Sequence, residues 1–221
     1  MSEERVQEKA GRMPGRGEEI ANSLTHGVGA GLAVAALVLL VVFSVRYGDV
    51  WRVVSLSIFG ATLVLLYTAS TLYHAFTNQR VKRIFQVLDH SCIYLLIAGS
   101  YTPLTLVHLR GPWGWSLFGA VWGLALFGIW FKAFFTGRFQ AVSVALYLLM
   151  GWLLVIAIKP ALAVVPPGLL FWIVLGGLSY TLGVIFFVLD KKPYFHAIWH
   201  VFVLAGSTLH FFGMLFYLPV K

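Results

Sequence analysis

The sequence predicts an all-α integral membrane protein of seven transmembrane helices, with a cytoplasmic amino terminus and the carboxyl terminus outside. Three observations lead to this prediction. Of the 221 residues, 60% are hydrophobic and 11% are charged, which is too little polar content to coat a soluble globule. Apolar runs of span length recur along the chain. Lys and Arg are more numerous on one side of these runs than on the other.

Seven apolar runs account for the helices. They lie near residues 24–45, 52–76, 86–108, 113–132, 140–158, 167–189 and 195–218. At about 1.5 Å per residue, each run can cross a hydrocarbon core of about 30 Å as a helix. The runs are too long for membrane strands and lack the alternating pattern of a membrane barrel.

Short polar or Gly- and Pro-containing segments end each run and precede the next. In order they are residues 46–49, 78–83, 110–112, 136–138, 159–160 with 166–167, and 190–193. Glycines also stand four residues apart, Gly27 with Gly31 and Gly119 with Gly123. Such spacing is expected to let neighbouring helices approach closely.

Two regions are predicted along the chain. Residues 1–19 carry nine charged side chains among Gly and Pro, which is typical of a solvated cytoplasmic tail. Residues 20–221 then form the seven-helix membrane domain. A cleaved signal peptide is not expected, because the charged stretch is of mixed sign and precedes a run of span length.

The distribution of Lys and Arg predicts the orientation. Eleven fall on the side of the amino terminus and five on the other side, or seven and five without the tail. This excess predicts that the amino terminus of the multi-pass protein is inside. The expected location is the plasma (inner) membrane. The net charge of +8 is interpreted as contact with anionic lipid, not nucleic acid, because no basic stripe accompanies it.

Five polar side chains are predicted to lie at nearly one depth on three helices. Ser70 and His74 form an SxxxH pair, His196 and His200 form an HxxxH pair, and Asp89 opens the third helix. The three histidines and the aspartate are four to eight residues from the nearest cytoplasmic charge, or about 6–12 Å along a helix. Ionisable side chains at such depths are costly and indicate function.

The residue types point to a metal. Residues four apart share a helix face, so His196 and His200 can both reach one ion. With His74 they offer three nitrogens, the number in a catalytic zinc site that keeps its fourth position for water. Ser70 and Asp89 are expected to hold that water or orient a ligand. Two alternatives stay open: histidines that only hydrogen-bond between helices, and Asp89 as a helix cap.

Three other histidines are interpreted differently. His210 is ten residues beyond His200, about 15 Å along the helix, and cannot bind the same ion. His90 is turned by about 100° from Asp89 and is expected to hydrogen-bond to a neighbouring helix. His26 lies at a compatible depth and is expected either to support the site or to line its cavity.

The stretches that hold these residues resemble the haemolysin III family, the bacterial branch of the progestin and adipoQ receptor superfamily. They are residues 19–31 (EIANSLTHGVGAG), 70–74 (STLYH), 89–103 (DHSCIYLLIAGSYTP) and 196–200 (HAIWH). The resemblance implies seven helices and a zinc ion held by His74, His196 and His200, with Asp89 and Ser70 near the zinc-bound water. The superfamily is similar to alkaline ceramidases, which implies hydrolysis of a lipid amide. Bacterial members are also associated with membrane-fluidity homeostasis and, through the haemolysin label, with pore formation.

Three functions are therefore weighed. The first is zinc-dependent hydrolysis of an amide or ester in a membrane lipid near the inner leaflet, with Asp89 moving a proton and Ser70 steadying the water. The second is a sensor or regulator of membrane state, in which zinc is structural and Asp89 fills its fourth position. The third, a pore or transporter, is disfavoured because polarity is concentrated at one depth. The sequence predicts neither a particular lipid nor an oligomeric state.

Overall fold

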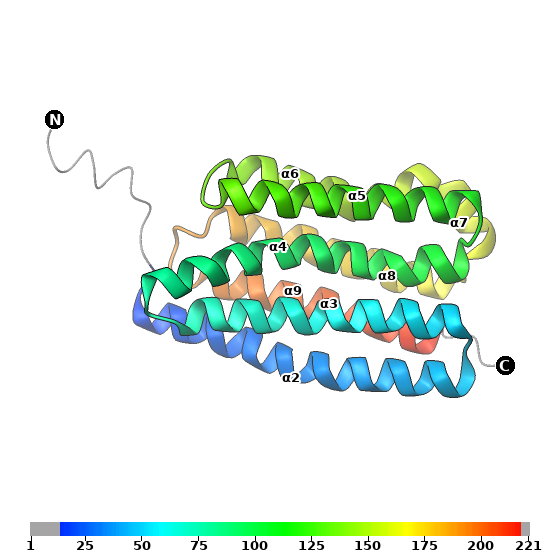
Figure 1. Ribbon diagram of the computed structural model, residues 1–221, viewed down its shortest axis with the longest axis horizontal. Helices are drawn as coiled ribbons and strands as arrows, with labels where there is room; N and C mark the ends of the chain where they lie inside the picture. Colours follow the sequence, from blue (N-terminus) through cyan, green and yellow to red (C-terminus); the bar gives the residue numbers. More distant parts are fainter. Residues whose placement is uncertain (1–13, 218–221) are drawn as a thin grey trace, which may run out of the picture.

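The computed structural model describes residues 14–217, which form a bundle of long helices without a strand (Figure 1). The elements are α2 (Arg16–Tyr47), α3 (Val50–Ala75), α4 (Gln79–Pro103) with the π-helical turn η1 (Leu104–His108), α5 (Pro112–Phe135), α6 (Gln140–Gly151), the 3₁₀ turn η2 (Leu153–Ala157), α7 (Ile158–Val164), α8 (Pro167–Val188) and α9 (Phe195–Phe216). Because α6, η2 and α7 form one span, the described residues contain seven helices long and apolar enough to cross a membrane. The prediction of an all-α, seven-helix membrane fold is confirmed.

The helices form a closed ring. α2 packs along α3, α3 along α4 and α4 along α5, while α9 packs against both α8 and α2. α2 and α9 begin at the same end of the bundle, where α3 finishes and α4 begins (Figure 1). We call this the histidine end. Residues 1–13 of the predicted tail, and residues 218–221, lie outside the described residues.

Polar side chains point inward and apolar side chains cover the outside. Leu24, Leu126 and Ile156 are more than 60% exposed, whereas Asn22 and Ser70 are at most 1% exposed. The interior also contains an apolar core that includes Leu40, Phe59 and Leu63. An apolar exterior with buried polar groups suits a bundle surrounded by lipid, in which polar groups must find partners inside the protein.

Two helices begin well before their apolar runs. α2 starts at Arg16 and α4 at Gln79, compared with the predicted residues 24 and 86. The added turns are polar but stable as helix: Glu18 lies in the first turn of α2, where acidic groups are favourable. The Asn78 side chain caps α4 by accepting from the N–H groups of Arg80 and Val81. An apolar run thus locates the part of a helix inside the membrane, not the end of the helix.

Only one of the four paired glycines lies against a neighbouring helix. A Cβ atom placed on Gly27 would lie 3.7 Å from the Thr71 side chain of α3, whereas one placed on Gly31, Gly119 or Gly123 would meet no atom of the described residues within 4 Å. Close approach occurs at other glycines, including Gly29, which packs against the Tyr67 ring beside the site described below. Four-residue spacing does not reveal which face of a helix meets a neighbour.

Candidate metal centre

Three histidines converge at the histidine end of the bundle. His74 lies in the last turn of α3, and His196 and His200 lie in the first two turns of α9. One ring nitrogen from each lies within 4.8 Å of the others, and the ring centroids are 4.7–5.2 Å apart. Three imidazoles in this arrangement can hold a metal ion.

The start of α9 is anchored by the start of α2. Tyr194, which precedes α9, has the left-handed backbone conformation with φ 62°, which is uncommon for a bulky residue. Its backbone N–H donates to Glu18 Oε1 at 2.7 Å. This hydrogen bond fixes the chain two residues before His196, and so helps to place both α9 histidines.

The His74 ring is held at one nitrogen and free at the other. Its Nδ1 lies 2.6 Å from Glu19 Oε2 and 3.4 Å from the Asn22 side-chain nitrogen. Its Nε2 is buried and has no hydrogen-bond partner among the described residues. A buried nitrogen without a partner is costly unless something else binds it, and this nitrogen is available to a metal.

The His200 ring is also held at its Nδ1, by groups of α2. Its Nδ1 lies 3.2 Å from the Asn22 carbonyl oxygen and 3.2 Å from Thr25 Oγ1, both on α2. Ligating histidines commonly donate the second ring N–H to a carbonyl or carboxylate, which fixes the tautomer and the orientation of the ring. α2 therefore supplies no histidine to the cluster but supports two of its members. The residues present fit a bound metal.

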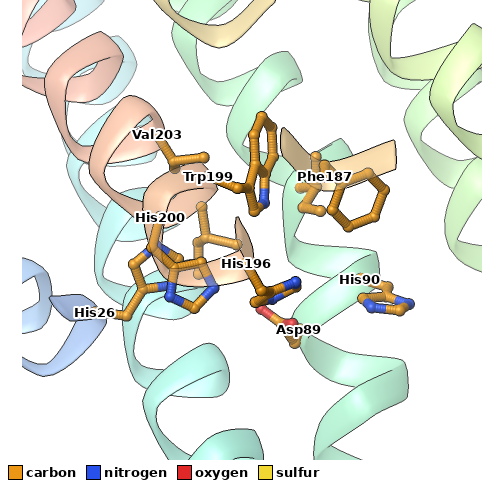
Figure 2. A pocket seen from close by; sticks show the side chains of 10 residues that line it. His26, Asp89, His90, Phe187, His196, Trp199, His200 and Val203 are labelled. Atoms are coloured by element: carbon orange, nitrogen blue, oxygen red, sulfur yellow. The ribbon is translucent and has the colours of Figure 1, made fainter. Parts of the chain in front are cut away.

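Asp89 and Ser70 lie beside the histidines in the interior. Ser70 is one turn before His74 on α3, and its buried hydroxyl faces the Asp89 carboxyl. Asp89, 5% exposed, comes from α4. Figure 2 shows it next to the His196 ring. The cluster of atoms close enough to share an ion contains no carboxylate among the described residues, so Asp89 stands outside the three-nitrogen group.

A small cavity of about 20 Å³, comparable to the space that one water molecule needs, lies beside Asp89 and the α9 histidines (Figure 2). Its polar lining comes from Asp89 and four histidines, namely His26, His90, His196 and His200. The remaining lining is apolar and consists of Leu66, Ile93, Phe187, Trp199 and Val203. Polar side chains and apolar side chains therefore face each other across this small cavity.

The remaining buried histidines differ from one another. His26 stacks on His200 with ring centroids 3.5 Å apart, and neither of its nitrogens has a partner within the described residues. His90 points away from His196 (Figure 2). His90 was predicted to hydrogen-bond to a neighbouring helix, but its ring Nδ1 has no partner in the described chain. The contact with a neighbouring helix is made by its backbone carbonyl oxygen, which accepts from the Tyr147 hydroxyl at 3.0 Å. His210 is remote from the cluster, as predicted, and its Nε2 lies 3.1 Å from the Ile173 carbonyl oxygen of α8.

Sequence reasoning missed Glu19, which it placed at the end of a solvated tail. A signal was present: Glu19, Asn22 and His26 are spaced by three and four residues, which puts them on one face of a helix. In the structure that face meets His74 and His200. If this polar stripe had been read as part of a helix, the predicted first helix would have begun before Glu19, and Glu19 would have been assigned to the site.

Comparison with known proteins identifies the family of the chain. A family profile described as Haemolysin-III related matches residues 15–211. The chain is 50% identical to a Hemolysin-3 homolog of Bacillus subtilis (strain 168), over 90% of this chain and 94% of that protein. It is 47% identical to Hemolysin-3 of Bacillus cereus, over 90% and 91%. It is 31% identical to the human Monocyte to macrophage differentiation factor, over 91% and 84%. The chain belongs to the haemolysin III family, within the progestin and adipoQ receptor superfamily.

Proposed function

We propose that this protein is a zinc-dependent membrane hydrolase that cleaves an amide or ester bond of a lipid near the inner leaflet. One observation carries the proposal. Three histidines converge on a common point, and beside them lies a buried carboxyl group, Asp89, that is not a member of the three-nitrogen group. Three protein ligands and a free fourth position are typical of catalytic zinc, whereas structural zinc has four protein ligands.

Each polar residue has a role in this proposal. His74, His196 and His200 hold the ion. Bound there, zinc supplies a Lewis acid that polarises a carbonyl and makes water a nucleophile near neutral pH. Asp89 takes a proton from the attacking water and delivers it to the leaving group. The Ser70 hydroxyl, which faces the Asp89 carboxyl, donates a hydrogen bond to the negative charge that develops on the carbonyl oxygen.

The membrane setting supports a lipid as the substrate class. Phe187 and Trp199 line the small cavity beside the histidines, so the hydrocarbon next to a reacting lipid carbonyl would meet apolar side chains there. A membrane helix bundle receives such a substrate from the surrounding lipid. We place the histidine end at the cytoplasmic face of the plasma membrane, because the excess of Lys and Arg lies at that end of the helices.

The metal is tested first. Wild-type protein is compared with the double variant His196→Ala, His200→Ala, and zinc is measured by elemental analysis after purification without chelator. We expect about one zinc per chain in the wild type and a loss of more than 90% in the double variant. His210→Ala is the matched control, since His210 is a buried histidine of the same helix outside the cluster, and it should keep its zinc. Equal zinc in all three proteins would overturn the metal proposal.

The reaction is tested second. Zinc-loaded protein is incubated with labelled ceramides and phospholipids, and Asp89→Asn is compared with the wild type. The variant should keep its zinc and lose about 10²- to 10⁴-fold in rate, which is the usual contribution of general acid–base catalysis. If Asp89→Asn loses zinc instead, Asp89 is a ligand, and the site is the closed, structural zinc site of a membrane sensor.

A further inference from the structure

We propose that Glu19 is a positioning residue that fixes the protonated nitrogen of His74 and thereby directs its Nε2 to the metal. This inference rests on the proposed metal site and adds a residue to it. The contact that carries it is short: Glu19 Oε2 lies 2.6 Å from His74 Nδ1. His74 is buried, and its other nitrogen has no partner within the described chain.

The chemistry of a carboxylate determines the tautomer. An ionised carboxylate only accepts hydrogen bonds, so a close contact with it requires a proton on Nδ1. A neutral imidazole with hydrogen on Nδ1 has its lone pair on Nε2. Glu19 therefore leaves His74 ready to bind a cation at Nε2, in the carboxylate–histidine–metal arrangement that raises the basicity of the ligand.

Asn22 does not compete with this assignment. Its side-chain nitrogen lies 3.4 Å from His74 Nδ1, which is long compared with the contact to Glu19. Its Oδ1 is buried without a partner among the described residues. Exchange of the amide oxygen and nitrogen, which look alike in most structures, would place an acceptor near the Nδ1 hydrogen and reinforce the same tautomer.

Glu19 is itself held by a neighbouring helix. Its second oxygen, Oε1, lies 2.8 Å from Lys82 Nζ of α4. Lys82 also donates to the carbonyl oxygen of Tyr73 at 3.2 Å and lies 4.9 Å from the centre of the Tyr73 ring. The carboxylate thus uses one oxygen for each partner, so its position depends on α3 and α4 together. A freely exposed ion pair would hold it much less firmly.

The adjacent glutamate offers a matched comparison. Glu18 accepts from two backbone N–H groups, those of Gly15 at 2.8 Å and Tyr194 at 2.7 Å. A glutamine at position 18 keeps an acceptor for one of these bonds. A glutamine at position 19 offers His74 a donor as well as an acceptor, so both tautomers of the ring become possible.

The experiment reads the His74 tautomer in full-length, metal-free protein by ¹⁵N NMR of ¹⁵N-histidine-labelled samples in nanodiscs. The His74 signal is identified by its absence from His74→Asn. We expect hydrogen on Nδ1 in the wild type and in Glu18→Gln, and a mixture of the two tautomers in Glu19→Gln. Glu19→Asp, which restores an acceptor-only carboxylate, should restore hydrogen on Nδ1.

Zinc affinity, measured by competition with a chelator on the same proteins, is the second readout. Glu19→Gln should bind zinc about 10- to 100-fold more weakly than the wild type, and Glu19→Asp should lie between them. Because Glu18 itself anchors the start of α9, the control for zinc affinity is Asp49→Asn at the opposite end of the bundle, which should match the wild type. An unchanged tautomer in Glu19→Gln, or a shift equal to that of Glu18→Gln, would overturn the role of Glu19. Absence of zinc from the wild type would instead overturn the proposed function, while the tautomer comparison would still decide whether Glu19 orients His74.

Discussion

Two buried polar clusters in this bundle differ in whether their atoms are paired within the chain. The hydroxyl cluster consists of Tyr67, Tyr180, Ser207 and His210. Tyr67 donates to Ser207 Oγ at 2.7 Å, and the Tyr180 and Ser207 hydroxyls are 2.8 Å apart. His210 Nε2 bonds to a carbonyl of α8, and of the atoms in this cluster only His210 Nδ1 lacks a partner in the described chain. This cluster joins α3, α8 and α9.

The histidine cluster, with Ser70 and His26 beside it, is unpaired where it faces inward. Among residues 14–217, His74 Nε2 and both nitrogens of His26 have no hydrogen-bond partner, and the Ser70 hydroxyl faces the Asp89 carboxyl. Each unpaired group costs about 1–3 kcal/mol when it is left unsatisfied. Both clusters are buried, but among the described residues only the histidine cluster has a group of unpaired hydrogen-bonding atoms that could bind a metal and a substrate. We therefore expect substitutions in the hydroxyl cluster to change stability and substitutions in the histidine cluster to change metal binding and catalysis.

Among the variants that compare the two clusters, Ser70→Ala has the largest expected effect. Because Ser70 is proposed to donate to the developing oxyanion, the rate of lipid hydrolysis should fall about 10²- to 10³-fold, while the melting temperature should fall less than in Ser207→Ala, whose hydroxyl bonds to both Tyr67 and Tyr180. Hydrolysis and thermal unfolding are measured on the same zinc-loaded preparation. Ser207→Ala is the control and should show the opposite pattern. A large loss of stability in Ser70→Ala would contradict the distinction between the clusters.

Tyr67→Phe should have a smaller effect, and it should change stability instead of catalysis. The change keeps the ring that packs on Gly29 and contacts His26 and removes only the hydroxyl bonded to Ser207. The free energy of unfolding should fall by about 1 kcal/mol, the usual net value of one hydrogen bond, with zinc content and hydrolysis unchanged. Reversible unfolding in mixed detergent micelles measures the first quantity. A stable but inactive variant would show that the hydroxyl cluster takes part in the chemistry.

Much of the fold could be predicted from the sequence because a membrane imposes a length on apolar runs. All seven spans were located, since about 20 apolar residues are needed to cross hydrocarbon. The early starts at Arg16 and Gln79 were missed, because polar turns outside the membrane leave no hydropathy signal. The packing glycines were also missed, because the inward face of a helix depends on neighbours that are distant in sequence.

The site was predictable to the extent that it is local. HxxxH and SxxxH are four-residue spacings on single helices, and counting residues from the loops placed His74 near the α9 pair. Support from α2 was not predictable in this way. The contact from Glu19 to His74 spans 55 residues, and Glu19 ends a stretch of charges that resembles a tail. Glu19 reaches His74 only because α2 packs against α3 and α9 in the folded bundle.

The smallest effect is expected at the opposite end of the bundle, where Asp49 caps α3. It accepts from the backbone N–H of Arg52 at 2.9 Å and pairs with the Arg52 guanidinium at 2.8 Å. Partial burial acts to raise the pKa of the Asp49 carboxyl, but these contacts with Arg52 hold it below its ordinary value. A lowered pKa in the folded state means that the ionised cap stabilises the protein above about pH 4. This stabilisation disappears as the pH falls through the folded-state pKa.

Asp49→Ala should therefore lower the free energy of unfolding by about 1 kcal/mol at pH 7, the usual cost of losing a helix cap. The difference from the wild type should shrink toward zero as the pH is lowered below about 4. Unfolding of the metal-free proteins at a series of pH values measures it, so that protonation of the histidines affects both proteins equally. Zinc affinity at pH 7 should be unchanged, because every polar contact of Asp49 is with its own end of the bundle. A pH-independent difference would show that Asp49 acts through packing instead of its charge, and a change in zinc affinity would show that the two ends of the bundle are coupled.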